Sequence, residues 1–275
     1  SVWFSTPKLS YDISADKGEY QLIPAENSIF GKIGKGKYIL SPFADTPRFQ
    51  FDYELYQYDL QDVIAGFYDK PFLKGPADLN LHISTMGRDR ESLVENLEGT
   101  LDLRAFKLSL YGFNLDRIIR KFERTQKFNL VDVSALVLAG PVGLAVSKSG
   151  SYVDILTSKR GDSTVITELS SKWIFKMGRA SIEDVAFATE ENRIAATGYV
   201  DYRSDSLDFQ VAALDKNGCP IIAQEIKGNR KDPEMDGVKV VPTILKPVSK
   251  LFAGVLGKDC EVFYRGRVAH PEEKE

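Results

Sequence analysis

Strict alternation of apolar and polar residues limits this chain of 275 residues to a fold built from β-strands. Residues 48–55, Arg-Phe-Gln-Phe-Asp-Tyr-Glu-Leu, alternate without a break, and residues 78–83, 100–103 and 207–211 repeat the pattern. A period of two puts every second side chain on the same face, as a half-buried strand requires. Residues 261–268 follow the pattern more loosely and predict a further strand.

Turn signals separate the alternating runs, because glycine and small polar residues favour the backbone conformations of tight turns. Together the runs and turns predict a meander of short antiparallel strands with one apolar and one polar face. The turn segments are Lys17-Gly18-Glu19, Gly34-Lys35-Gly36, Met86-Gly87-Arg88, Lys176-Met177-Gly178 and Arg203-Ser204-Asp205-Ser206.

Helices are expected to interrupt the meander in a few places. Asn114 is suited to cap a helix N-terminus, and Asp116 in the first turn favours the same start. Residues 90–97 and 163–169 predict two shorter helices. The apolar residues of the first helix fall on one face and are expected to plug one end of the core: Leu115, Ile118, Ile119 and Phe122.

The stretch 238–256 is apolar but has lysines at positions 239, 246 and 250, and Pro242 and Pro247 divide it. Lysines beside apolar residues are typical of an amphipathic segment that faces anionic lipid headgroups. The same stretch could instead be a crossover connection between strands. Both interpretations stand at this point.

Composition argues against two classes of protein. A net charge of −3 and an isoelectric point near 5.6 argue against a nucleic-acid binder, which usually presents a strongly basic face. The longest apolar run, residues 133–146, is broken by Gly140, Pro141 and Gly143 and is too short to span a bilayer. No signal peptide is visible at the first residue. We expect one β-rich domain over residues 1–275, a fragment of a longer chain whose membrane anchor is missing.

Two cysteines, Cys219 and Cys260, lie 41 positions apart, each at one end of a strand-like run. A disulfide between them would close a long loop and stabilise the fold by roughly 4 kcal/mol through the entropy of the unfolded chain. It would also indicate an oxidising compartment. Two unrelated buried thiols are the alternative. Since the spacing is not CxxC, metal binding or thioredoxin-like chemistry is not expected.

Catalytic motifs are missing from the sequence, so we expect no enzyme activity. The two histidines, His82 and His270, fall on the polar phase of a strand and in a terminal tail, where a structural or solvent role is expected. The glycines of residues 31–37 lack the spacing of a phosphate-binding loop and predict a hairpin turn with solvated lysines. No cofactor and no metal site are predicted. The carboxylates that surround one turn match no calcium loop: Asp201, Asp205 and Asp208.

Glycines and leucines in a fixed order give the chain a family resemblance. A glycine precedes a strand that alternates in leucine, and a second glycine precedes a short helix and a Leu-x-Gly. A further strand then leads to a helix that opens in Leu-Asp. These positions are Gly75, Leu79, Leu81, Gly87, Leu93, Leu97, Gly99, Leu101, Leu103 and residues 112–116, Gly-Phe-Asn-Leu-Asp.

With these motifs, and with the segments 128–143, 183–195 and the two cysteine segments, the chain resembles the C-terminal region of AsmA-family envelope proteins of Gram-negative bacteria. The resemblance is clearest over residues 71–268. It implies a β-rich fold curled into a groove, related to bridge-like lipid-transfer proteins. It also implies a periplasmic protein, tethered to the inner membrane, that contributes to phospholipid transport between the inner and outer membranes and to outer-membrane homeostasis.

The predicted fold is mainly β (α+β): a curved antiparallel sheet that forms a groove or half-barrel, with three to five short helices packed on its ends. The expected partners are phospholipid acyl chains, the membrane and an envelope protein. In the alternative, the apolar face is a closed core and the chain is an envelope scaffold that regulates assembly of outer-membrane protein or lipopolysaccharide. The groove candidates are Phe49, Phe51, Tyr53, Leu55, Leu79, Leu81, Ile83, Leu101, Leu103, Phe209 and Val211.

Overall fold

The computed structural model describes residues 11–24, 34–65, 72–112, 114–117, 119–120, 163–230, 232–235, 239–240 and 260–273. All described strands belong to one sheet of 14 strands, and every strand pair in it is antiparallel. The two end strands of the sheet do not pair with each other, so the sheet is not closed. The prediction of a mainly antiparallel β fold is confirmed. The assignment of residues 1–275 to one domain stays a prediction.

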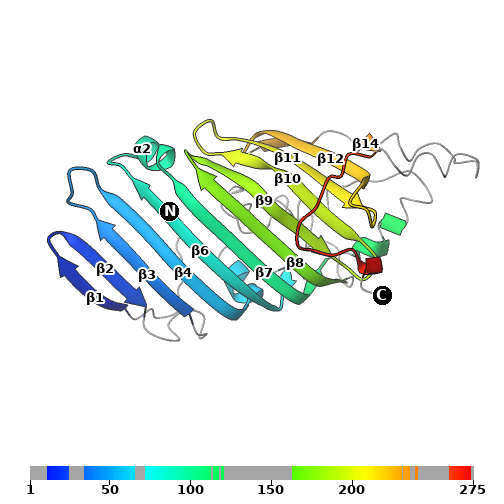
Figure 1. Ribbon diagram of the computed structural model, residues 1–275, viewed down its shortest axis with the longest axis horizontal. Coiled ribbons are helices and arrows are strands. Elements are labelled where there is room, and N and C mark those ends of the chain that lie inside the picture. The colour runs from blue at the N-terminus through cyan, green and yellow to red at the C-terminus, as the bar shows by residue number, and fades with distance from the viewer. Residues whose placement is uncertain are drawn as a thin grey trace, which may run out of the picture.

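Strand order in the sheet follows chain order, and Figure 1 shows the strands side by side along the long axis of the molecule. Two short strands lie off this path: β5 (Leu73–Lys74) pairs with β7, and β14 (Lys239–Val240) pairs with β12. The path is β1 (Tyr11–Asp16), β2 (Glu19–Pro24), β3 (Gly34–Ser41), β4 (Arg48–Asp59), β6 (Pro76–Met86), β7 (Glu98–Tyr111), β8 (Ser163–Lys176), β9 (Arg179–Ala188), β10 (Arg193–Asp201), β11 (Ser206–Leu214), β12 (Pro220–Asn229) and β13 (Asp232–Met235).

The four strictly alternating runs all lie in strands, namely β4, β6, β7 and β11. The helix expected at residues 90–97 is α2 (Arg90–Glu95), which begins with a capping box formed by Asp89 and Ser92. Residues 115–117 and 119–120 are helical as expected, and Leu115 and Ile119 are buried. Ile118, Phe122 and nearly all of the stretch 238–256 lie outside the described residues.

Two residues with left-handed backbone, Gln57 (φ 52°) and Lys107 (φ 57°), interrupt the alternation of β4 and β7. At Gln57 the pairing with β6 shifts by one residue, as in a β-bulge, and the Gln57 backbone N–H donates to the Asp78 carboxylate at 2.8 Å. Leu55 and Tyr58 are consequently both buried although they are three positions apart.

The helix predicted for residues 163–169 is wrong, because this segment is the first half of β8. It pairs with β7 across the interruption at Lys107, with Leu108 opposite Ile166 and Ala105 opposite Leu169. Ile166 and Leu169 therefore both contact the core although they are three positions apart. That spacing resembles one face of a helix, and in the strand pair it spans the position opposite Lys107 of β7.

Two further predictions of local structure are wrong. Residues 34–36 are not a turn but the start of β3, where Gly34 and Gly36 pair with Leu55 and Tyr53 of β4. Residues 261–268 are not a strand: they form an irregular segment that runs across β8 to β11 in Figure 1. The short helix η1 (Pro271–Glu273) follows this segment. The expected turns at residues 17–18, 177–178 and 202–205 are present.

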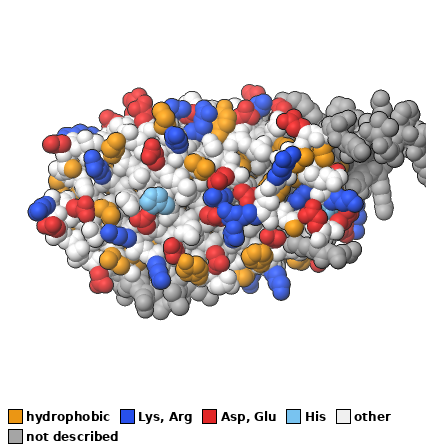
Figure 2. Space-filling view, viewed as in Figure 1, with side chains coloured by type: hydrophobic (Ala, Val, Ile, Leu, Met, Phe, Trp, Pro, Cys, Tyr) orange, Lys and Arg blue, Asp and Glu red, His pale blue; other side chains and the backbone are white. Residues whose placement is uncertain are grey.

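The two sides of the sheet differ in chemistry. One side, called the apolar face below, carries an apolar cluster from Tyr53 of β4 to Ile226 of β12. The helix α1 (Leu60–Ala65) and Phe72 pack against this face, as do the helical residues Leu115 and Ile119. The opposite side, called the polar face, is turned to the viewer in Figure 2, which shows acidic and basic side chains interspersed along its length.

Candidate functional site

All of the groove candidates lie on the apolar face. In the strand pairing Phe51 lies opposite Ile83, Tyr53 opposite Leu81, and Leu55 opposite Leu79. Cross-strand partners share a face of the sheet. The register continues through β7, where Leu101 lies opposite Leu81 and Leu103 opposite Leu79. On β11, Phe209 and Val211 belong to the same apolar cluster.

Burial divides these candidates into two groups. The half-buried group lies on the outer part of β4 and on β6, where the apolar face is incompletely covered. The buried group is concentrated nearer the middle of the sheet, where the apolar face is a closed core. Half-buried are Phe49, Phe51, Leu79, Leu81 and Ile83. Buried are Tyr53, Leu55, Leu101, Leu103, Phe209 and Val211.

The apolar face also extends over β1, β2 and β3, which the sequence analysis did not include. Ile13 of β1 lies opposite Leu22 of β2, and Leu22 lies opposite Tyr38 of β3. Ile13 is 66% exposed, whereas Leu22 and Tyr38 are half-buried. The strict alternation of residues 11–16, Tyr-Asp-Ile-Ser-Ala-Asp, is the signal that could have identified this extension.

An aromatic cluster lies on this part of the apolar face. The Tyr38 ring contacts Tyr11 edge-on at a centroid distance of 5.9 Å and Phe51 edge-on at 5.4 Å. It stacks against Tyr53 at 6.2 Å, with an angle of 18° between the ring planes. Tyr11, Tyr38 and Tyr53 come from β1, β3 and β4, so three strands contribute tyrosine rings to one place.

Two glycines of β3 make room for the Tyr53 ring. A Cβ atom added at Gly36 would lie 2.2 Å from Tyr53 Cδ2, and one added at Gly34 would lie 2.9 Å from the Tyr53 hydroxyl. The ring therefore lies flat across the backbone of β3. This packing explains why Tyr53 is only 7% exposed although the β1–β3 part of the face is half-open.

The hydroxyls of Tyr38 and Tyr53 resist ionisation. Burial raises the pKa of Tyr38 to about 12, and the neighbouring Tyr11 adds to the rise. Burial also raises the pKa of Tyr53, with smaller contributions from Tyr38 and Tyr11. Both groups are neutral hydrogen-bond donors at any physiological pH.

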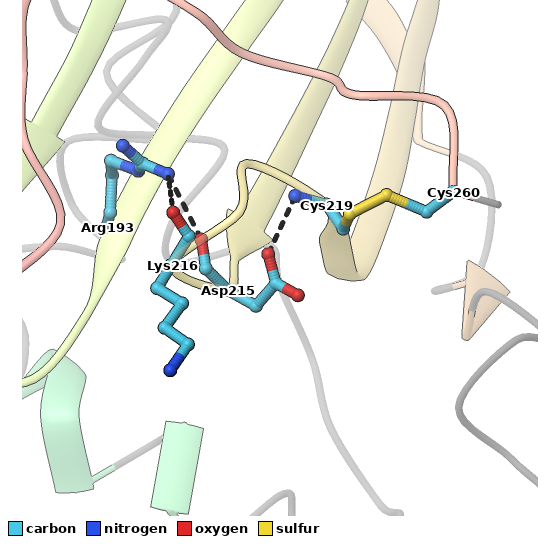
Figure 3. Close-up of a disulfide and its surroundings, with 5 residues drawn as sticks. All are labelled: Arg193, Asp215, Lys216, Cys219 and Cys260. Carbon is cyan, nitrogen blue, oxygen red and sulfur yellow. Dashed lines mark hydrogen bonds between the residues drawn. A yellow bond between two sulfur atoms is a disulfide. The ribbon is translucent and has the colours of Figure 1, made fainter. Parts of the chain in front are cut away.

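On the polar face, the disulfide between Cys219 and Cys260 attaches the C-terminal segment 260–273 to the loop after β11. Figure 3 shows how this loop is held: the Cys219 backbone N–H donates to the Asp215 carboxylate at 2.8 Å. Arg193 Nη2 donates to the carbonyl oxygens of Asp215 and Lys216. The expected pairing of the two cysteines is confirmed.

A hydrogen-bonded network fixes the segment 260–273 farther along. The Tyr264 hydroxyl donates to the buried Asp184 carboxylate at 2.5 Å and accepts from the Val268 backbone N–H at 3.1 Å. Arg267 bridges Asp102 of β7, at 2.9 Å, and Asp184 of β9, at 3.6 Å. These contacts hold the segment 260–273 against the polar face of β7 and β9.

The two histidines and the three carboxylates around the turn after β10 have partners in the described part of the chain. Asp52 contacts His82 across β4 and β6 on the exposed polar face. His270 is buried, and its Nδ1 accepts from the Glu272 backbone N–H at 3.3 Å. The three carboxylates that surround one turn each have a basic partner: Asp201 binds Arg179 and Arg203, Asp205 binds Arg230, and Asp208 lies 3.7 Å from Lys227 Nζ.

Among the described residues, no group of three or more histidine, cysteine, aspartate or glutamate side chains is placed to hold a metal ion. No helix in the described part of the chain is long and apolar enough to cross a membrane. Comparison of the chain with protein-family models, with curated proteins and with solved structures found no match.

Proposed function

We propose that this chain is a non-enzymatic module of the bacterial cell envelope that shelters lipid acyl chains on the apolar face of its sheet. In this proposal it contributes to phospholipid transport between the inner and outer membranes and to outer-membrane homeostasis. The resemblance to the AsmA family suggests the periplasmic location and the inner-membrane tether, and the disulfide fits an oxidising compartment.

The observation that carries the proposal is the uneven covering of a continuous apolar face. Around β7 to β11 the face is closed, but on β4 and β6 Phe51, Leu81 and Ile83 are only half-buried, and on β1 Ile13 is exposed. An apolar surface left incompletely covered in a folded chain is typical of a binding site. The free energy gained is about 0.8 kcal/mol per methylene buried, so one long acyl chain supplies enough to hold a lipid.

A second candidate function rests on the closed part of the face. There the sheet is covered by α1 and by the helical residues Leu115 and Ile119, as in an ordinary core. If the whole face were closed in this way, the chain would be an envelope scaffold that binds a protein partner. The half-buried residues of β4 and β6 favour the lipid-binding proposal over this one.

Lipid extraction followed by mass spectrometry tests the proposal, on protein purified from a bacterial periplasm without detergent. We expect stoichiometric phospholipid above the level found on an unrelated secreted β-protein. The Ile83→Gln variant places a polar group on the apolar face and should retain about tenfold less lipid. The matched Ser84→Gln variant changes the next residue, which faces the polar side opposite Gln50, and should retain the wild-type amount. Protein that carries no lipid above the blank would refute lipid binding and favour the scaffold.

A further inference from the structure

Among the described residues, the aromatic cluster of β1, β3 and β4 brings three tyrosine rings together on the N-terminal part of the apolar face. Tyr11 and Tyr38 are two strands apart in the sheet, so their backbones are separated by about 10 Å. Their ring centroids are only 5.9 Å apart. The side chains therefore lean toward each other over β2, and the Tyr53 ring of the neighbouring strand β4 stacks on Tyr38.

The Tyr53 hydroxyl is available to a ligand. No described residue hydrogen-bonds to it. Among the described residues, the fully buried side-chain nitrogen or oxygen atom that has no partner is Arg193 Nε. The Tyr53 hydroxyl, which also has no partner, is therefore not sealed from solvent. The hydroxyl lies over Gly34, where a Cβ atom would be only 2.9 Å from it, so the absence of a side chain there gives the hydroxyl its place. The ring is thus fixed by packing while its polar end stays accessible.

The surroundings of these hydroxyls restrict the ligand to a neutral acceptor. The described residues of β1 to β4 that share the apolar face carry no charged side chain. Lys35 and Lys37 of β3 point to the polar face, where they lie opposite Glu54 and Asp52. A phosphate or carboxylate brought to the tyrosines would lose water without gaining a cation. A carbonyl oxygen requires only a hydrogen-bond donor.

We propose that Tyr11, Tyr38 and Tyr53 form a site that hydrogen-bonds the ester carbonyl of an acylated lipid. This site rests on the proposed lipid-binding function and deepens it. The ester end of the acyl chain is held at β1 to β4, and the chain extends over the half-buried residues Leu81 and Ile83 of β6. Lipids are selected by the ester linkage, independently of the headgroup.

A competition between two phospholipids tests the site. Purified protein is incubated with vesicles that contain equal amounts of diacyl and dialkyl-ether phosphatidylethanolamine of the same chain length, and bound lipid is analysed by mass spectrometry. The ether lipid has the same chains and headgroup but no carbonyl. We expect the wild type to bind about ten diacyl molecules for each diether molecule, since one or two hydrogen bonds in an apolar site are lost with the ether.

Tyrosine-to-phenylalanine variants assign the selectivity to the cluster. Tyr38→Phe and Tyr53→Phe keep the ring packing and should bring the ratio close to one. Tyr56→Phe is the matched control: Tyr56 also lies on β4, but its hydroxyl is exposed and donates to Glu54 at 2.7 Å, so the ratio should stay at the wild-type value.

The outcomes separate this site from the proposed function. If the wild type binds both lipids equally, the carbonyl site is refuted while lipid binding stands. If the protein binds neither lipid, the proposed function itself fails and the site fails with it. A selectivity that survives in Tyr38→Phe and Tyr53→Phe would place carbonyl recognition elsewhere on the molecule and would also refute the assignment.

Discussion

At the scale of single residues, the packing of Tyr53 on Gly36 shows how a glycine in a strand serves an aromatic neighbour. Glycine weakens a strand interior, because it has no side chain to pack and loses much conformational entropy on folding. Here the space above Gly36 is filled by the Tyr53 ring, which contributes a large buried area to the core. The glycine is needed for room, since its backbone conformation is ordinary for a strand.

We predict that Gly36→Ala destabilises the protein. The added Cβ would lie 2.2 Å from Tyr53 Cδ2, so the ring must move out of its place on β3. Overpacking of this kind costs about 1–3 kcal/mol of the free energy of unfolding, measured by denaturant titration. Lys35→Ala is the control, because this residue is exposed on the polar face of the same strand, and it should change stability by less than about 0.5 kcal/mol. Equal stability of the two variants would show that the Tyr53 ring has room to shift.

Among the site residues, alternation predicted which residues share the apolar face but not how deeply each is buried. Phe49 and Val211 belong to equally clear patterns, yet the first is half-buried and the second fully buried. Burial depends on which segments cover the sheet, and that information is not local in the sequence. The tyrosine cluster was missed for the same reason, because Tyr11 and Tyr38 meet only across the intervening strand β2.

At the scale of elements, the C-terminal segment 260–273 is held to the sheet by covalent and polar contacts. It is tied at one end by the disulfide and farther along by the Tyr264–Asp184 hydrogen bond. Between them, the Phe263 backbone N–H donates to the Gly218 carbonyl at 2.9 Å. Tyr264 and Val268 also cover small residues on the polar face, such as Ala186 and Ala212.

We predict that the double variant Cys219→Ser with Cys260→Ser has a free energy of unfolding lower by about 2–4 kcal/mol. The two cysteines are 41 positions apart, and without the bond the loop between them gains conformational entropy in the unfolded chain. Hydrogen exchange should show lost protection in residues 260–273 and unchanged protection in β4 to β7. Tyr264→Phe, which keeps the disulfide, should cost about 1–2 kcal/mol, because the hydroxyl that donates to Asp184 and accepts from the Val268 backbone N–H is lost. Uniform loss of protection over the whole sheet in the double variant would contradict a local role of the bond.

Elements were predicted well where alternation was regular and poorly where it was not. The strands β4, β6, β7 and β11 follow from their period of two. The first half of β8 was mistaken for a helix: its residues Ile166 and Leu169 both contact the core although they are three positions apart, a spacing that also fits a helix. Residues 261–268 alternate like a strand but pair with none, since their apolar side chains cover the polar face of strands already paired on both edges.

At the scale of the whole molecule, buried tyrosines control the response to alkaline pH. Burial raises the pKa of Tyr38 to about 12. Burial also raises the pKa of four other tyrosines. In the unfolded chain all of these tyrosines titrate near pH 10. The folded state therefore holds protons that the unfolded state releases above that pH. The other buried tyrosines with raised pKa values are Tyr53, Tyr58, Tyr202 and Tyr264.

We predict that the free energy of unfolding is independent of these tyrosines below about pH 9 and falls steadily above about pH 10. The sign follows from the raised pKa values, because the stabilisation is complete below the unfolded pKa and is lost as pH rises. Denaturant titrations between about pH 8 and pH 11 measure the slope, and Tyr58→Phe should reduce it. Phenolate absorbance that develops fully in the folded protein at about pH 10.5, with stability unchanged, would contradict the prediction.

For the whole molecule, the sequence predicted the fold class but not how the apolar face is covered. Composition and alternation indicate an antiparallel meander, and the sheet is one. The uneven covering of its apolar face depends on contacts between segments far apart in the chain, such as Leu115 with the Thr164 side chain. No period in the sequence encodes such contacts, so the extent of an open surface had to come from the structure.

The agreement between strand order and chain order has a consequence for how this molecule is made. Each new strand along the path β1 to β13 can pair with the strand synthesised just before it, so the sheet can grow from one end as the chain emerges, without waiting for distant partners. Cys260 comes after the last of these strands and meets Cys219 only when β11 and β12 are in place. Formation of the disulfide thus follows the pairing of the described strands, and its rate of appearance reports how fast the C-terminal part of this sheet is built.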